Sequence, residues 1–159
     1  MPTRSNIKIV YGGTELYLYR HCDGYPAVNG VDLCKALLSE KGPSAFVSTL
    51  LAQGEESRYA DKGFRHDYEV TCGWHGDIEW AYVITFDTSA PYKMPAVAYA
   101  KIGFGFDRET ILGRLDDESK LVFSELSVDE FSAYCRDAER MMEFAQARLG
   151  AAGCTKAVR

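Results

Sequence analysis

NIKIVYGGTELYLYRH, residues 6–21, predicts a β-hairpin near the start of the chain. Apolar residues occupy every second position on both sides of the glycine pair Gly12-Gly13. These apolar residues are Ile7, Ile9, Leu16 and Leu18. Alternation on both sides of a Gly-Gly pair is typical of two strands joined by a tight turn. The other face of the second strand carries Tyr17, Tyr19 and His21, so we expect another segment to cover part of it.

Helical spacing of apolar residues begins after this hairpin. The spacing from Pro26 through residue 38 predicts one helix, and Pro43 opens a second apolar segment that ends at Gly54. The stretch that follows, EESRYADKGFRHD, is polar and predicts a loop of about a dozen residues, a length that is often functional.

The strongest strand signal is YEVTCGWHGDIEWAYVITFD, residues 68–87. It predicts a hairpin with a strand that ends at Cys72, a turn over residues 73–77 and a second strand. One face of that second strand is apolar: Ile78, Trp80, Tyr82, Ile84 and Phe86. PAVAYAKIG, residues 95–103, predicts a further strand, whose small residues at 96, 98 and 100 would let a helix lie close. DRETILGRL, residues 107–115, indicates either a short helix or a last strand.

The clearest single element is a C-terminal amphipathic helix. Ser127 and Glu130 have the spacing of a capping box, and Gly150 can end the helix. Apolar residues repeat every three or four positions between them: Phe131, Tyr134, Cys135, Ala138, Met141, Met142, Ala145 and Leu149. Burial of this stripe would contribute on the order of 10 kcal/mol of gross hydrophobic stabilisation.

These elements predict one α+β domain. We expect an antiparallel sheet of about five strands, with helices packed mainly on one face and a long amphipathic C-terminal helix. Residues 1–153 form the predicted domain, and residues 154–159 form a frayed tail. A chain of 159 residues is about one domain long, and 47% hydrophobic residues supply enough apolar material for its core.

Composition argues against several functional classes. The net charge of −5 does not suit a nucleic-acid binder, because neutralisation of phosphates supplies most of such a protein's affinity. The longest apolar runs are far shorter than the ~20 residues of a membrane span, and no secretory signal is recognisable. Five scattered cysteines with no C-x-x-C pair indicate free thiols and a cytoplasmic protein. We therefore expect neither direct nucleic-acid binding nor membrane association.

YRHCDGYPAVNG, residues 19–30, is the first candidate site. Turn chemistry explains most of it, since Asp23-Gly24 forms a turn and Pro26 starts a helix. It does not explain why His21 and Tyr25 flank that turn. The functional alternative makes His21 an acid–base group or metal ligand, Asp23 its orienting partner and Tyr25 a hydrogen-bond donor. Cys22 follows His21 directly and points to the opposite face of a strand, so we expect an inert thiol.

GWHGDIEW, residues 73–80, is the second candidate site. Trp74, His75 and Asp77 either belong to an ordinary turn or form part of a binding surface. If this turn lies beside His21 and Asp23, the histidines and carboxylates could perform acid–base work or hold a metal. No metal-ligand spacing such as H-E-x-x-H occurs within one segment, and we expect no metal and no cofactor.

LDDESKLVFSELSVDE, residues 115–130, is the third candidate site because it holds six carboxylates and one lysine. Such a run indicates either a solvated loop and helix start or an acidic docking surface. The carboxylates of the docking alternative are Asp116, Asp117, Glu118, Asp129 and Glu130.

Three segments in the same order carry a resemblance to a known family: PTRSNIKIVYGG, LYRHCDGYP and HGDIEWAYVI. The chain resembles small proteins of phages, prophages and bacterial genomes that share an H-x-D-G-Y-P core and a later G-D-I-E-(Y/W) strand. It departs from them at Cys22, where the family commonly has Trp, and at residues 27–30, where AVNG replaces E-G-x-G. The resemblance covers roughly the first 100 residues and implies phage-related genome context rather than a particular chemistry.

Two functional hypotheses follow. In the first, the protein is a non-catalytic interaction domain. The resemblance implies a phage-encoded inhibitor that binds and blocks a host defence component, as anti-CRISPR proteins do. A homo-oligomer is compatible with this role. In the second, it is a small enzyme or ligand-binding domain that uses His21, Asp23 and Tyr25, with or without His75 and Asp77. The lack of a strong catalytic motif favours the first.

Overall fold

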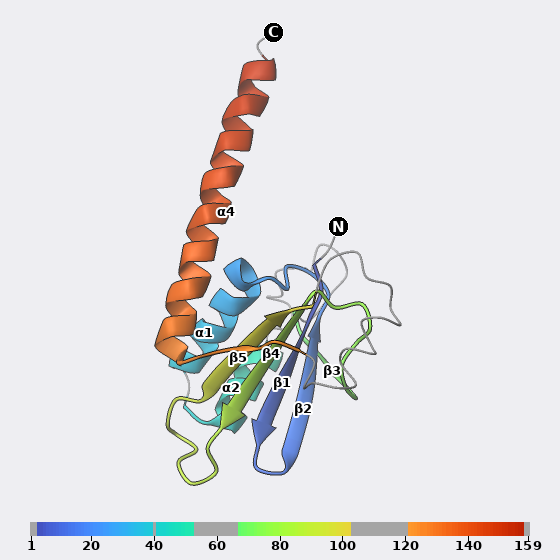
Figure 1. Ribbon diagram of the computed structural model, residues 1–159, viewed down its shortest axis with the longest axis vertical. Coiled ribbons are helices and arrows are strands. Elements are labelled where there is room, and N and C mark those ends of the chain that lie inside the picture. Colours follow the sequence, from blue (N-terminus) through green and yellow to red (C-terminus); the bar gives the residue numbers. More distant parts are fainter. Residues whose placement is uncertain (1–2, 40, 53–66, 103–120, 158–159) are drawn as a thin grey trace.

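The computed structural model describes residues 3–39, 41–52, 67–102 and 121–157, and these form one α+β domain (Figure 1). Its sheet has six strands in the order β3-β2-β1-β4-β5-β6. The strands are β1 (Ser5–Tyr11), β2 (Thr14–Arg20), β3 (Glu69–Thr71), β4 (Trp80–Phe86), β5 (Ala96–Lys101) and β6 (Ser124–Leu126). The predicted fold class is confirmed, with one strand more than expected.

The sheet is antiparallel except at its centre, where β1 and β4 run parallel. The predicted hairpin of β1 and β2 is confirmed, and Gly12 adopts a φ of 61° in its turn, a conformation that favours glycine. The predicted hairpin within residues 68–87 is wrong. β3 pairs with β2 and β4 pairs with β1, so residues 72–79 cross the sheet instead of joining two neighbouring strands.

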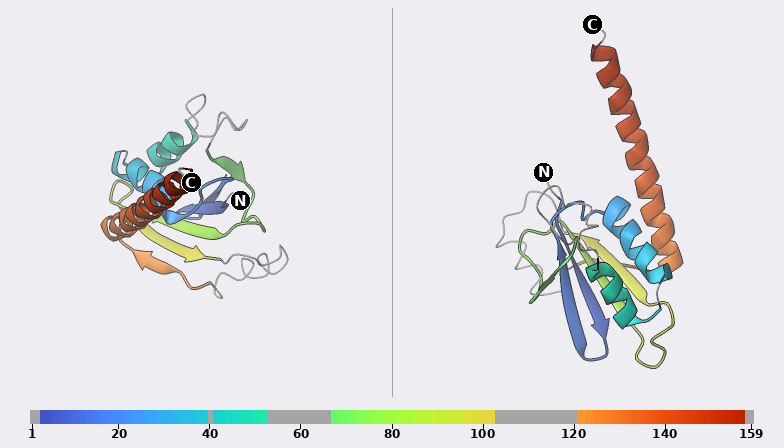
Figure 2. Two further views of the ribbon diagram at one scale, coloured as in Figure 1. Left: turned by 90° about the horizontal axis from the view of Figure 1, so that it is seen from above. Right: turned by 180° about the vertical axis from the view of Figure 1, so that it is seen from behind.

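One face of the sheet is covered by the helices (Figure 2). These are the π-helical turn η1 (Pro26–Gly30), α1 (Val31–Ser39), α2 (Pro43–Leu51) and α4 (Val128–Ala157). The main core lies between the two layers and includes Ile7, Leu18, Tyr82 and Phe131. The alternation of β1 and β2 thus directs the predicted apolar residues toward the helices.

A smaller apolar cluster lies on the opposite face of the sheet. It contains Tyr19, Ile78, Ala81, Ala100 and Ile102, with Trp74 packed against it. Ile78 was expected to face the same side as Tyr82, but it precedes β4 and lies in this second cluster instead. The expectation that a helix would lie against the alanines of β5 is also wrong, because Ala100 belongs to the cluster opposite the helices.

α4 begins as predicted and then differs from the prediction. The Ser127 backbone N–H donates to Glu130 Oε2 at 2.8 Å, and the Glu130 N–H donates to Ser127 Oγ at 3.2 Å, which is the expected capping box. The helix continues past Gly150 to Ala157. The expected burial of its whole apolar stripe is wrong: Phe131 and Cys135 are buried, whereas Leu149 is exposed.

Candidate functional site

The segment Tyr19–Gly30 is the junction that joins β2 to the helical layer. A Cβ on Gly24 would lie 2.7 Å from Ser5 Cβ, so only glycine lets this turn approach β1 so closely. The Gly24 N–H donates to Thr3 O at 2.8 Å, and the buried Tyr82 hydroxyl donates to Gly24 O at 2.8 Å. Pro26 starts η1. Packing therefore accounts for the D-G-Y-P part of the first candidate site.

A buried polar network lies beneath this junction. The Arg20 side chain is fully buried, and its Nη1 lies 2.8 Å from Asp32 Oδ2 and 2.9 Å from Tyr68 Oη. Its Nε donates to Cys22 O at 2.9 Å. The Tyr68 hydroxyl donates to Asn29 Oδ1 at 2.6 Å, and burial raises the pKa of Tyr68 above its ordinary range. These bonds tie β2, η1, α1 and the start of β3 together.

Arg20 is not among the residues predicted for the sites, although the sequence contains a signal for it. Leu16, Leu18 and Arg20 share one face of β2 by the two-residue period, so Arg20 had to point into the core. Burial of a charged side chain is costly unless the charge is paired, so a charged residue on an apolar strand face predicts a partner of opposite charge. That partner is Asp32, at the start of α1.

On the other face of the sheet, two of the predicted sites meet at Tyr19. We call Tyr19, His21, Glu69, His75 and Asp77 the Tyr19 cluster. The His75 ring stacks on Tyr19 with ring centroids 4.2 Å apart, and the His21 ring meets Tyr19 edge-on at 4.5 Å. His21 Nε2 lies 3.3 Å from Glu69 Oε1. The sequence left open whether the two histidine segments are neighbours, and the structure brings His21 and His75, but not Asp23, to the same tyrosine.

Hydrogen bonds hold the Tyr19 cluster in place. The Tyr19 hydroxyl lies 2.9 Å from Asp77 Oδ2 and donates to this carboxylate, which also contacts Arg4 Nε at 3.3 Å. The His75 backbone N–H donates to Asn6 Oδ1 at 2.7 Å. Burial, and secondly the hydrogen bond to Asp77, raise the pKa of Tyr19 above its ordinary range. Tyr19 is therefore a protonated hydrogen-bond donor at neutral pH and cannot serve as a base.

The crossing segment extends this row of rings to Trp74. Trp74 meets Tyr17 edge-on with ring centroids 5.3 Å apart, while His75 stacks on Tyr19. Tyr17 and Tyr19 are two residues apart on β2 and point to the same face. The predicted cover over this face is thus the segment that carries Trp74 and His75. Both side chains remain partly open to solvent.

The remaining predicted residues lie elsewhere. Asp23 adopts a φ of 54° and accepts a hydrogen bond of 3.0 Å from the Tyr25 hydroxyl, so these two residues brace the turn. Asp129 and Glu130 are exposed in the first turn of α4, and hydrogen bonds from Ser127 lower the pKa of Glu130. Residues 116–118, the other part of the acidic surface, lie outside the described residues.

The cysteines divide into buried and exposed thiols. Among the cysteines whose side chains the structure describes, Cys22, Cys34 and Cys135 are buried and Cys72 is exposed, and these four form no disulfide with one another. The Cys34 and Cys135 thiols are hydrogen-bonded between α1 and α4, which lowers the pKa of Cys34 and raises that of Cys135. In the part of the chain that the structure describes, no three histidine, cysteine or acidic side chains are placed to share a metal ion.

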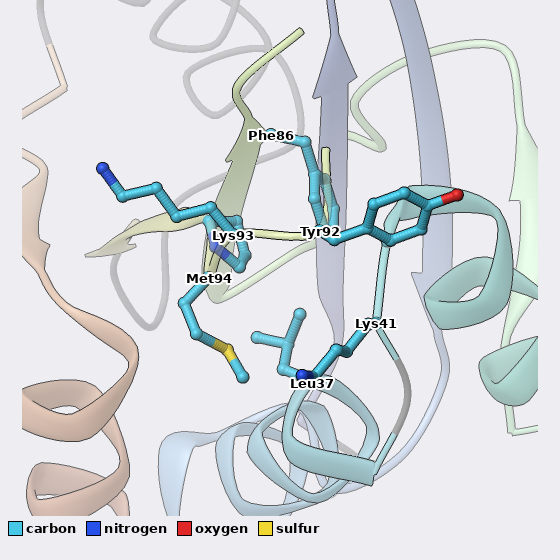
Figure 3. Close-up of a pocket in the computed structure, with 8 residues that line it drawn as sticks. Leu37, Lys41, Phe86, Tyr92, Lys93 and Met94 are labelled. Carbon is cyan, nitrogen blue, oxygen red and sulfur yellow. The ribbon is translucent and has the colours of Figure 1, made fainter. Parts of the chain in front are cut away.

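A hollow between the end of α1 and the β4–β5 connection offers little room (Figure 3). Lys41, Tyr92 and Met94 contribute to its lining, and its volume is about 10 Å³. That volume holds roughly one water molecule. This hollow does not accommodate an organic ligand.

Comparison with known proteins adds no assignment: no family model, curated protein or solved structure matches the chain. Among the described residues, no helix has the length and hydrophobicity to cross a membrane.

Proposed function

We propose that the protein is a non-catalytic interaction domain that binds another protein through Trp74, His75 and the Tyr19 cluster. The observation that carries this proposal is the row of rings on the face of the sheet opposite the helices. Trp74 rests on Tyr17 and His75 rests on Tyr19, and both upper rings remain partly exposed. Tryptophan and tyrosine are enriched among the residues that dominate binding energy at interfaces.

Rigidity supports the same proposal. Tyr19 is held by Asp77, and the backbone of His75 is held by Asn6, so the rings are ordered before a partner arrives. A surface ordered in advance loses less conformational entropy on binding than a mobile loop does. The charges of Arg4, Glu69 and Asp77 surround the rings, where they would steer a partner's approach and set its orientation.

The identity of the partner rests on the resemblance alone. Small proteins with the H-x-D-G-Y-P core occur in phages and prophages, and this context makes a host defence component the proposed partner. In this proposal the protein acts by occupying that component's working surface, and it performs no reaction.

Affinity capture with matched variants tests the proposal. Tagged wild-type protein, Trp74→Ala and His75→Ala are each used to capture proteins from bacterial lysates, with quantification by mass spectrometry. We expect one stoichiometric partner and a loss of about 30-fold in its affinity with Trp74→Ala, which corresponds to roughly 2 kcal/mol. Tyr92→Ala is the control, because Tyr92 is 73% exposed in the distant β4–β5 connection. Equal capture by Trp74→Ala and the control would contradict the proposal.

A second candidate function is a small-ligand or acid–base site, favoured by the two imidazoles that contact one phenol. His21 has Glu69 as a charged neighbour, an arrangement that can orient an imidazole for proton transfer. A ligand of this site would raise the melting temperature of the wild type but not of His21→Ala. A compound screen in which the two proteins respond alike would count against this candidate.

A further inference from the structure

α4 extends far beyond the domain to which it is attached (Figures 1 and 2). Its 30 residues span about 45 Å, at 1.5 Å per residue. Val128, Phe131 and Cys135 are buried, and a Cβ on Gly30 would overlap the Cys135 sulfur, so the first two turns pack tightly against η1. From residue 143 to residue 150 every side chain is exposed.

The apolar stripe continues along the extended part of the helix. Phe131, Cys135, Ala138, Met142, Ala145 and Leu149 are separated alternately by four and three residues. This is the seven-residue repeat with which helices pair along their length. Met142 is partly buried and Leu149 is 72% exposed, so the face that packs on the domain at Phe131 lacks a covering segment farther out.

The part of α4 beyond residue 143 has little helical stability of its own. It contains Gly150 and Gly153, and glycine is the least favourable helix residue after proline. Most helices in proteins are stabilised by packing of an apolar face rather than by intrinsic propensity. A helix of this composition therefore implies a second surface that packs against it.

The distribution of charge along α4 identifies that surface. Residues 128–143 contain five acidic and two basic residues, a net charge of −3, whereas residues 144–157 contain two basic and no acidic residues, a net charge of +2. An antiparallel second copy of α4 would place its Arg148 at the level of Glu139 and near Glu143 of the first copy. These residues lie beyond Phe131 and Cys135, which the domain buries. A parallel copy would place like charge beside like charge, which is unfavourable.

The sizes of the stripe residues favour the same arrangement. The seven-residue repeat has two apolar positions. Met142 and Leu149 lie at the first of them, and Ala138 and Ala145 lie at the second. In an antiparallel pair the two positions face each other, so Met142 meets Ala145 and Leu149 meets Ala138 of the second copy. Large residues opposite small ones fill each layer and let the helices approach closely. A parallel pair would place alanine opposite alanine in every second layer.

A groove at the base of α4 adds to this surface. It lies between α1 and α4, has a volume of about 190 Å³, and is lined in part by Val28, Val31, Met142, Glu139 and Glu143. Its charged lining residues are Asp32, Glu139 and Glu143 against Lys35, and in an antiparallel pair Arg148 of the second copy lies beside this groove. We infer that the protein forms a homodimer through antiparallel pairing of the extended part of α4.

The mass in solution tests the dimer. Light scattering during size-exclusion chromatography should give twice the chain mass of 17.7 kDa for the wild type. Leu149→Asp should give the mass of one chain, because it places a charge in the stripe without touching the folded domain. Ala147→Asp is the matched control on the opposite face of the same turn and should remain dimeric. A monomeric wild type, or a dimer that Leu149→Asp leaves intact, would overturn the inference.

Disulfide cross-linking tests the direction of pairing, in a background that carries serine at positions 72 and 154. An Ala138→Cys chain mixed with a Leu149→Cys chain should form a cross-linked dimer on mild oxidation. Ala138→Cys alone should remain uncross-linked, because the second copy presents Leu149 at that position. Self-cross-linking of Ala138→Cys without cross-linking of the mixture would show a parallel pair and refute the antiparallel arrangement.

Discussion

Replacement of Asp32 by alanine should strongly destabilise the protein, because it leaves a buried guanidinium without its carboxylate. Arg20 is 0% exposed, and its Nη1 lies 2.8 Å from Asp32 Oδ2. Removal of one member of a buried ion pair typically costs about 3–5 kcal/mol. Arg20 keeps the oxygens of Cys22, Asn29 and Tyr68 as partners, so we expect the lower end of that range, about 3 kcal/mol.

Urea denaturation followed by tryptophan fluorescence measures this cost as the change in the free energy of unfolding. A loss of about 3 kcal/mol is a large part of the roughly 5–15 kcal/mol by which domains are stable. It corresponds to a melting temperature lower by roughly 6–12 °C for a chain of this length. Asp137→Ala is the matched control, since Asp137 pairs with Arg140 on the surface at 3.5 Å, and such pairs contribute about 0–1 kcal/mol.

The order of two variants tests the physical reasoning more sharply. Arg20→Met removes the buried charge itself and leaves the hydrogen bond between Tyr68 and Asn29 in place, so it should cost less than Asp32→Ala. If Asp32→Ala costs no more than the surface control, or less than Arg20→Met, the assignment of Asp32 as the essential partner of a buried charge is refuted.

Two further predictions concern packing and pH. Gly30→Ala should lower the melting temperature, because its Cβ would overlap the Cys135 sulfur, and Cys135→Ala in the same chain should restore part of the loss; no recovery in the double variant would contradict this close contact. Burial raises the pKa of Tyr19, Tyr68 and Tyr82 above the ordinary 10.0, so the unfolded state releases these protons first. Their contribution to stability is complete below pH 10.0 and decreases as the pH rises toward their folded-state values, so unfolding in base and the absorbance change of tyrosine ionisation should coincide. Ionisation of these three tyrosines while the fold is intact would contradict the assigned burial.

Local patterns in the sequence predicted the separate elements well. Alternating residues predicted β1 and β2, and the cap formed by Ser127 and Glu130 predicted the start of α4. Both signals depend on residues that are close together in the chain, so they can be recognised from the sequence without knowledge of the fold. The candidate site was recognised in two halves, His21 and His75, but nothing local indicated that Tyr19 would lie between their rings.

The partners of each element could be decided only by the tertiary structure. Residues 72–79 look like a turn, yet they cross the sheet because β1 and β2 already occupy the positions between β3 and β4. The apolar stripe of α4 predicts that one face of the helix is covered, but it does not predict which segment covers it. In the structure Phe131 is buried in the domain, whereas Leu149 on the same stripe is exposed. Arg20 lies on an apolar strand face in the sequence, but only the fold brings Asp32 to it. Period and capping depend on neighbours along the chain, whereas pairing and burial depend on residues that only the folded chain brings together.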